Sequence, residues 1–191
     1  MAVDIKHEHA VTVFEEWLMI KRKDRRHFRL IRHLAYLDWI MTGEGASPAV
    51  EDLAAAQAVS QLDNSEFLQC LMKLPYRRQV LTGDGEDVLA WFDHVEKTAH
   101  SHLFSNIGLL MEIVLDEEAG HSVQQWDSTT IATAHQLAEL SNDQLLTVIS
   151  QLASAKKQPR LSESQRAIGH QHDHRLHLHG QIEPVNDPRQ I

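Results

Sequence analysis

The chain has 191 residues, of which 42% are hydrophobic and 24% are charged, and its formal net charge is −9 at pH 7. This length provides one substantial hydrophobic core, and the composition is ordinary for a globular domain. The sequence contains no apolar run long enough to span a membrane, and its acidic N-terminal residues do not fit a secretory signal, so we expect a cytoplasmic bacterial protein.

The first segment, 5–41, has apolar residues at spacings of three and four, which predict helix. The apolar stripe lapses near Lys21–Asp24, where we expect a break or bend. Gly43 is a natural left-handed C-terminal cap, and Ser47 followed by Pro48 predicts the N-cap residue and first-turn proline of the next helix, over about 48–61.

Two middle helices are predicted within 48–74. Asp63 and Glu66 form an acidic variant of the capping box, and Pro75 ends the second of these helices. The stretch TGDG that follows is compatible with a tight turn, but its flanks predict no strands.

A third helical region is predicted over 86–155. Asp127 caps a helix over 128–139, and Ser141 with Gln144 forms a capping box for a helix over 142–155. The sequence therefore predicts an all-α fold, a bundle of about six to seven helices in a single domain over 1–155. We find no internal repeat, and we expect the His-rich tail, 156–191, to be flexible or disordered.

The most polarised feature is the basic stretch KRKDRRHFRLIRH, residues 21–33. Seven cations stand there against one acid, whereas the segment between Lys97 and Lys156 contains no Lys or Arg. On a continuous helix several of these cations recur at spacings of three and four, which predicts one cationic face. The candidate binding residues are Lys21, Arg22, Lys23, Arg25, Arg26, Arg29 and Arg32.

Two partners suit such a face equally well. Guanidinium groups bind phosphate oxygens, so DNA is one candidate. The other is an acidic protein surface, on a partner or on the Lys- and Arg-free segment of the same chain.

The tail also carries candidate metal ligands. Imidazoles at alternating positions in a flexible segment capture Ni²⁺, Cu²⁺ or Zn²⁺ without a preformed site. The candidates are His172, His174, His177 and His179.

Catalytic motifs are missing from the sequence. It contains no nucleotide-binding glycine loop and no H-E-x-x-H pattern, and the single cysteine, Cys70, lies in an apolar setting that predicts a buried thiol. We therefore expect no enzyme activity and no cofactor.

Two stretches carry a family resemblance. FSNIGLLMEIVLDEEAG and AHQLAELSNDQLLTVIS, within about 104–154, resemble the D subunit of the bacterial flagellar master transcriptional regulator. The residues that carry the resemblance are Asn106, Leu109, Leu110, Leu137, Ala138, Leu140, Ser141 and Gln144. The preceding residues have no counterpart in that family, and its cysteine-containing segment is replaced here by SAKKQPRLSES. The resemblance implies a helical regulator that dimerises and acts with a second, DNA-binding subunit.

The sequence as a whole predicts a non-enzymatic regulatory protein, a transcriptional regulator that acts with a partner subunit through its basic helix face. A protein partner, DNA and a second copy of the chain are its expected contacts. One alternative is a helical adaptor or assembly protein that docks on an acidic protein surface without nucleic acid. A second is a metal-binding protein that uses the His-rich tail.

Overall fold

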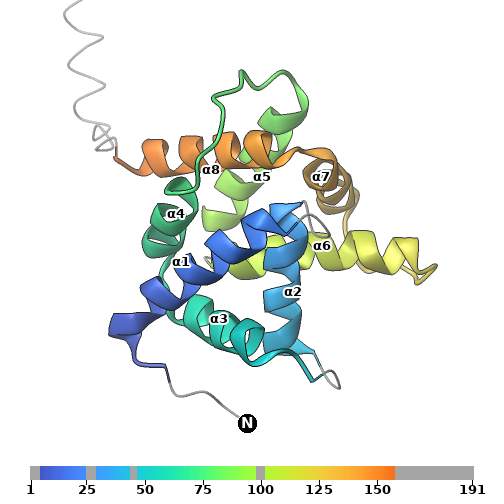
Figure 1. Cartoon of the computed structure of the whole chain (residues 1–191). Helices are drawn as coiled ribbons and strands as arrows, with labels where there is room; N and C mark the ends of the chain where they lie inside the picture. Colours follow the sequence, from blue (N-terminus) through green and yellow to red (C-terminus); the bar gives the residue numbers. More distant parts are fainter. Residues whose placement is uncertain (1–4, 25–28, 44–46, 98–101, 158–191) are drawn as a thin grey trace, which may run out of the picture. The chain divides into compact units, whose positions relative to one another are not determined.

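The computed structural model describes residues 5–24, 29–43, 47–97 and 102–157. Contacts divide the chain into two units, Met1–Ala155 and Lys156–Ile191, and the fold described below is that of the first. The described residues form eight helices and no strand (Figure 1): α1 (His7–Lys23), α2 (Leu30–Thr42), α3 (Val50–Gln61), α4 (Asn64–Met72), α5 (Asp84–Lys97), α6 (Leu103–Glu118), α7 (Ser128–Glu139) and α8 (Asn142–Lys157). The predicted all-α class is confirmed, with one or two helices more than we expected.

The additional helices arise where the predicted long segments divide. The segment 5–41 is two helices, because α1 ends at Lys23 and α2 begins only at Leu30. The last turn of α1 carries Lys21, Arg22 and Lys23, and cations are favourable at the negative end of a helix dipole. The region from 86 to the acidic DEEAG is likewise two helices, α5 and α6.

Two predicted caps were wrong. Gly43 ends α2 in an extended conformation and not a left-handed one. Helix α3 begins at Val50, with Ala49 and not Ser47 as its N-cap residue.

The two predicted capping boxes are present. The Glu66 backbone N–H donates to Asp63 Oδ1 at 2.8 Å, and the Asp63 N–H donates to Glu66 Oε2 at 3.0 Å. The same reciprocal pair opens α8, where the Ser141 N–H donates to Gln144 Oε1 at 2.9 Å and the Gln144 N–H to Ser141 Oγ at 3.3 Å. Both boxes stop a preceding helix and start a new one within three residues.

Our prediction of no internal repeat was wrong. Helices α3 and α7 have the same length, 12 residues, and each is followed by a capping box and a second helix. When Val50 is aligned to Ser128 without gaps, the pairs Ala54/Ala132, Ala56/Ala134, Leu62/Leu140, Asn64/Asn142, Leu68/Leu146 and Leu74/Leu152 are identical. The buried positions agree more widely, since Val59, Phe67 and Leu71 match the buried Leu137, Leu145 and Ile149.

The repeat extends to the helices before α3 and α7. With Leu30 aligned to Leu103, every buried position of α2 falls on a buried position of α6. Trp17 of α1 donates from Nε1 to Asp52 Oδ1 at 2.8 Å, and Trp91 of α5 donates to Thr130 Oγ1 at 3.4 Å. Asp52 and Thr130 occupy the same aligned position. The described helices therefore form two equivalent halves, α1–α4 and α5–α8.

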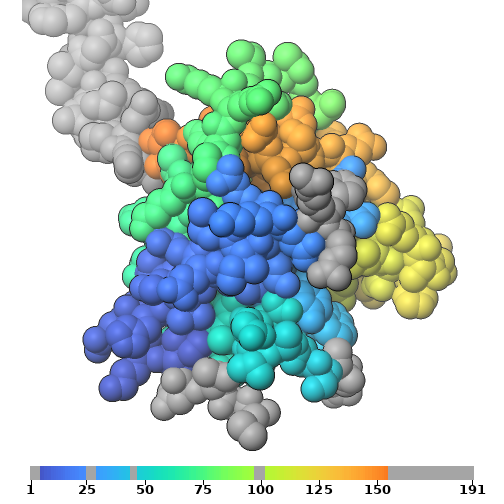
Figure 2. All heavy atoms as spheres, in the orientation of Figure 1, coloured from blue at the N-terminus to red at the C-terminus, as the bar shows by residue number. Residues whose placement is uncertain are grey.

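The packing of the first three helices is similar in both halves, whereas the contacts that α4 makes with α1 and α6 have no counterpart of comparable size at α8 among the described residues. Helix α1 packs on α3 and α5 packs on α7, while α2 also contacts α3 and α6 also contacts α7. Figure 2 shows α1 (blue) and α3 (cyan) side by side, a close contact that the buried Ala55, Ala56 and Ala58 of α3 permit. The halves meet where α2 contacts α6.

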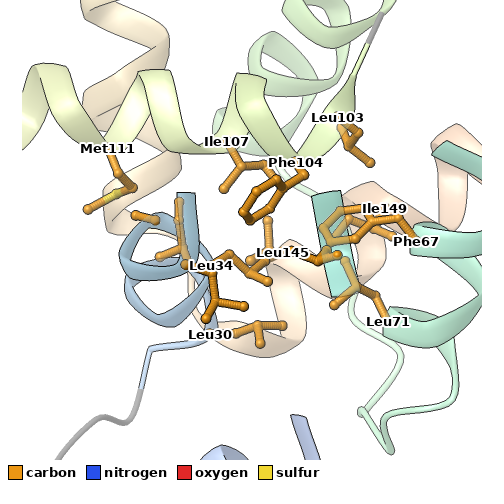
Figure 3. Close-up of a cluster of buried hydrophobic side chains, with 14 of the residues drawn as sticks. Leu30, Leu34, Phe67, Leu71, Leu103, Phe104, Ile107, Met111, Leu145 and Ile149 are labelled. Carbon is orange, nitrogen blue, oxygen red and sulfur yellow. The ribbon is translucent and has the colours of Figure 1, made fainter. Parts of the chain in front are cut away.

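The two halves share one hydrophobic core (Figure 3). The close-up shows the part of this core that α2, α4, α6 and α8 supply, with Leu34, Phe67, Phe104, Leu145 and Ile149 among its side chains. Buried residues of α1, α3, α5 and α7 belong to the same core. Each half therefore contributes side chains to the same core.

Each half also caps the central helix of the other. The Leu30 N–H, at the start of α2, donates to Asn142 Oδ1 of α8 at 2.6 Å. The Leu103 N–H, at the start of α6, donates to Asn64 Oδ1 of α4 at 2.8 Å. The N-cap residues of α2 and α6 themselves make no side-chain cap bond. Exchange of equivalent contacts in both directions is the pattern that a twofold relation produces.

We expect Asn64→Ala and Asn142→Ala each to lower the free energy of unfolding by about 1–2 kcal/mol, because each change leaves a helix N–H without its acceptor. Urea unfolding measures the loss. Ser65→Ala, at an exposed position one residue after Asn64, is the control and should change stability by less than about 0.5 kcal/mol. Equal losses for all three variants would contradict the capping role.

Candidate functional site

The basic stretch does not form the single helical face that its spacing predicted. Helix α1 ends at Lys23, and Arg29 lies outside α2 as its N-cap residue, so the helical register is interrupted between Lys23 and Leu30. Arg25 and Arg26 lie outside the described residues. The prediction was wrong because it assumed one continuous helix over 21–33, whereas α1 ends at Lys23 and α2 begins at Leu30.

Lys21 is part of a buried polar contact between α1 and α3. Its Nζ lies 3.1 Å from Asp52 Oδ1, an oxygen that also accepts from Trp17 Nε1, and it lies 5.9 Å from the centre of the Trp17 ring. Asp52 is only 8% exposed. A buried carboxylate requires such partners, so Lys21 stabilises the fold.

Two other cations of the basic stretch contact the Lys- and Arg-free segment. Arg29 donates from Nη1 to the backbone carbonyl of Ala138, in the last turn of α7, where carbonyls lack helical partners. Arg32 Nη2 lies 3.9 Å from Glu118 Oε1, and both side chains are exposed. Arg22 and Lys23 are the exposed cations that remain among the described members of the stretch. The basic and acidic parts of the chain therefore meet, in part, inside the fold.

The other sequence candidates give no site in the described residues. His172, His174, His177 and His179 lie outside them. Within the described ranges no group of three or more His, Cys, Asp or Glu side chains is placed to hold a metal ion. Cys70 is buried, as predicted, and burial raises the pKa of its thiol to about 12. Burial and a raised pKa keep this thiol in its protonated form, whereas the thiolate is the nucleophilic form.

A groove lies between α2 and α6. Its volume is about 700 Å³. Side chains of both helices line it: Arg32, Ala35, Tyr36, Asp38, Trp39, Thr42 and Gly43 from α2 and its cap, and Ser105, Gly108, Leu109, Met111, Glu112, Leu115 and Asp116 from α6. We call this surface the α2–α6 groove.

The α2–α6 groove lies where the two halves of the molecule meet. In the alignment of Leu30 with Leu103, every lining residue on α2 corresponds to a lining residue on α6, as Ala35 does to Gly108. The backbone framework is thus the same on both walls, but the chemistry differs. The α2 wall carries Tyr36 and Trp39, and the α6 wall carries leucines at the Tyr36 and Thr42 equivalents and the acidic Glu112 and Asp116.

The aromatic wall faces solvent. Tyr36 and Trp39 stack with their ring centres 6.1 Å apart, and Trp39 is 43% exposed. Leu115 on the opposite wall is 48% exposed. Large apolar side chains that gather in one groove and remain open to water are typical of interaction surfaces.

The floor of the groove depends on a glycine. A Cβ at Gly108 would lie 2.2 Å from Asp38 Oδ2 and 2.7 Å from Asp38 Cβ, so only glycine leaves room for the Asp38 side chain against α6. Burial there, and then the nearby Glu112 carboxylate, raise the pKa of Asp38 to about 6. The groove therefore holds a carboxylate that is costly to ionise.

Our reading of the sequence missed this groove. Its signal was the pair Tyr36 and Trp39, three residues apart on the side of α2 away from the buried stripe, but that pattern does not say which helix lies opposite. The position of α6 depends on contacts between the two halves, which local sequence does not encode.

The chain matches no family model, no curated protein and no solved structure. Within the part of the chain that the structure describes, no helix combines the length and the apolarity that a membrane crossing requires.

Lys21 and its neighbour Arg22 allow a test of whether a cation of the basic stretch stabilises the fold or only lies on the surface. We expect Lys21→Met to lower the free energy of unfolding by on the order of 2 kcal/mol, because Asp52 loses a charged partner in a buried setting. Arg22→Met, at an exposed position, is the control and should change stability by less than about 0.5 kcal/mol. Urea unfolding at neutral pH distinguishes the two, and equal effects would contradict the assignment.

The raised pKa of Asp38 predicts that the free energy of unfolding depends on pH. The pKa is raised in the folded state, so the fold favours the protonated carboxyl, and stability from this group falls as pH rises from about 4 to about 6. Asp38→Asn removes the charge, and we expect it to unfold at higher urea concentration than the wild type at pH 7.5, with no difference below about pH 4.

Asp127→Asn is the control for Asp38→Asn and should show the opposite sign. Hydrogen bonds from Thr130 lower the pKa of Asp127, so the stability that its carboxylate contributes is present at neutral pH and is lost as pH falls. Urea midpoints at pH values from about 2.5 to about 7.5 test both variants, since the Asp127 contribution is lost only below about pH 4. A gap for Asp38→Asn that is the same at every pH would contradict the buried-carboxylate account.

Proposed function

We propose that this chain is a non-enzymatic regulatory binding protein of the cytoplasm that docks on another protein through the α2–α6 groove. The observation that supports the proposal is the exposed aromatic and aliphatic lining of that groove, with Tyr36 and Trp39 on one wall and Leu115 on the other. Exposed aromatic side chains in a concave surface are the residues that most often supply binding energy at protein interfaces.

The alternatives drawn from the basic stretch receive less support. Three of its described cations, Lys21, Arg29 and Arg32, already have partners within the fold. Affinity for DNA increases with the number of phosphates that cations neutralise. Each cation that already has a partner within the fold therefore weakens the hypothesis that the basic stretch binds DNA. A regulator that leaves DNA contacts to a partner subunit, or an adaptor that needs none, agrees better with this arrangement.

One observation keeps a nucleic-acid contact as the second candidate. Arg22 lines a shallow pocket together with Pro75, and the loop after Pro75 carries the exposed Arg77 and Arg78. The backbone N–H of Arg77 donates to Asp143, which lines the same pocket as Arg22. Lys23 is the exposed last residue of α1, so Arg22, Lys23 and Arg77 offer cationic groups to phosphate.

A capture experiment with the full chain tests the proposal. We expect the tagged wild type to retain a protein partner from lysate after nuclease treatment, and Trp39→Ala with Leu115→Ala to lose it, because the apolar walls are truncated. Met41→Ala is the matched control, since Met41 lies on the same helix with the same exposure, 43%, outside the groove lining. Its capture should equal that of the wild type.

Loss of the captured partner on nuclease treatment would contradict the proposal and favour the second candidate. In that case binding to random duplex DNA should fall steeply between two salt concentrations, and Arg22→Gln with Lys23→Gln should reduce it. Capture that the groove variant leaves unchanged would contradict the use of this surface.

A further inference from the structure

We infer that the α2–α6 groove holds a single cationic amphipathic helix of a partner protein. Its apolar side contacts Tyr36, Trp39 and Leu115, and its Lys or Arg side chains face Glu112 and Asp116. This inference rests on the proposed function and specifies the chemistry of the partner.

The shape of the groove fits a helix better than a small molecule. The groove lies between two helices and is open along its walls, because Trp39 and Leu115 remain nearly half exposed. Sites for small molecules bury most of the ligand surface. A groove between two helices that carries exposed apolar side chains can receive the apolar face of an added helix.

The charge of the lining selects a cationic occupant. The lining contains three carboxyl groups, of Asp38, Glu112 and Asp116, and one cation, Arg32, whose guanidinium lies near Glu118 outside the lining. One oxygen of Asp116, Oδ1, lies 3.1 Å from His121 Nδ1. The groove thus presents a net negative charge beside an apolar wall. A Lys or Arg that lies along the α6 wall gains charge-assisted hydrogen bonds, and an acidic segment meets repulsion there.

The difference between the two walls favours one bound segment over a second copy of this chain. A twofold contact between two copies places the same patch against itself. Here it would bring the carboxylates of Asp38, Glu112 and Asp116 together near the axis with few cations to offset them. Like charges at such an interface are destabilising.

The C-terminal tail of the same chain is a poorer occupant. Residues 158–191 contain four arginines and no lysine, and these are balanced by four acidic residues, so the segment has no net positive charge at pH 7. It also has no apolar stripe at helical spacing. We therefore expect the bound segment to carry more cations than residues 158–191 and to have apolar residues at helical spacing.

Designed peptides test the inference with the full chain. The probe is a fluorescein-labelled 18-residue amphipathic peptide of Leu and Lys, of about five helical turns. Its counterpart has Glu in place of Lys. We expect the Leu/Lys peptide to raise its anisotropy on binding and to give one peptide per chain by calorimetry. We expect the Leu/Glu peptide to bind at least about tenfold more weakly, a difference of about 1.4 kcal/mol.

Variants locate the binding. Glu112→Gln with Asp116→Asn should weaken the Leu/Lys peptide about fivefold to tenfold and flatten its salt dependence. Trp39→Ala should weaken it at both salt concentrations. Glu8→Gln with Glu16→Gln removes two exposed carboxylates from α1 and is the charge-matched control, with affinity expected to stay at the wild-type value.

Each of the following results would overturn the inference. Both peptides bind with equal affinity, the Glu112 and Asp116 substitutions have no effect, two peptides bind per chain, or a peptide of residues 158–191 displaces the probe. Self-association of the chain that Trp39→Ala abolishes would assign the groove to a second copy instead. If the Leu/Lys peptide fails to bind while partner capture still requires Trp39, the partner chemistry is wrong and the proposed function stands. If capture does not require the groove, both fail.

Discussion

Two hydrogen bonds fix the arrangement of this molecule, one from the Leu30 N–H to Asn142 and one from the Leu103 N–H to Asn64. Helices α2 and α6 begin without a cap of their own, so the first donors of each need an acceptor from elsewhere. The acceptor comes in both cases from the first residue of a helix in the opposite half. The start of each central helix is therefore determined by the other half of the chain. The α2–α6 groove, which these two helices form, exists only when both halves are assembled.

Features that depend on a few neighbouring residues were predicted from the sequence, whereas contacts between distant segments were not. The capping boxes at Asp63 and Ser141 and the all-α class were predicted correctly, because caps and apolar periodicity act within a few residues. The duplication was missed because the halves agree in their buried positions far more than in their residues, as Asp52 and Thr130 do in accepting from Trp17 and Trp91. The cationic face was wrong because a helical period was carried across a break. The groove could not be predicted, because it requires the crossing of α2 and α6.

The charge asymmetry of the sequence has a structural explanation in part. Lys21 forms an ion pair with the buried Asp52 of α3, within the first half. Arg29, at the start of α2, donates to a backbone carbonyl at the end of α7, in the second half. The resemblance to the D subunit of the flagellar regulator stays a prediction, since no comparison bears on it. The duplication does change its context. The residues over 30–74 repeat the architecture of the residues over 103–152, within which the resemblance lies. The first half, which had no counterpart in that family, has one within this chain.

Because the two halves belong to one polypeptide, their groove walls can differ, and this difference affects the orientation in which a partner binds. In a homodimer, a substitution in a groove on the twofold axis appears on both walls at once, and a bound segment fits equally well in either direction. Here Trp39 and Glu112 occupy equivalent positions and are encoded separately, so one wall is aromatic and the other acidic. A partner that enters this groove meets two distinguishable sides. It can therefore be held in one orientation, with its N- and C-terminal ends assigned, which a symmetric groove is unable to impose.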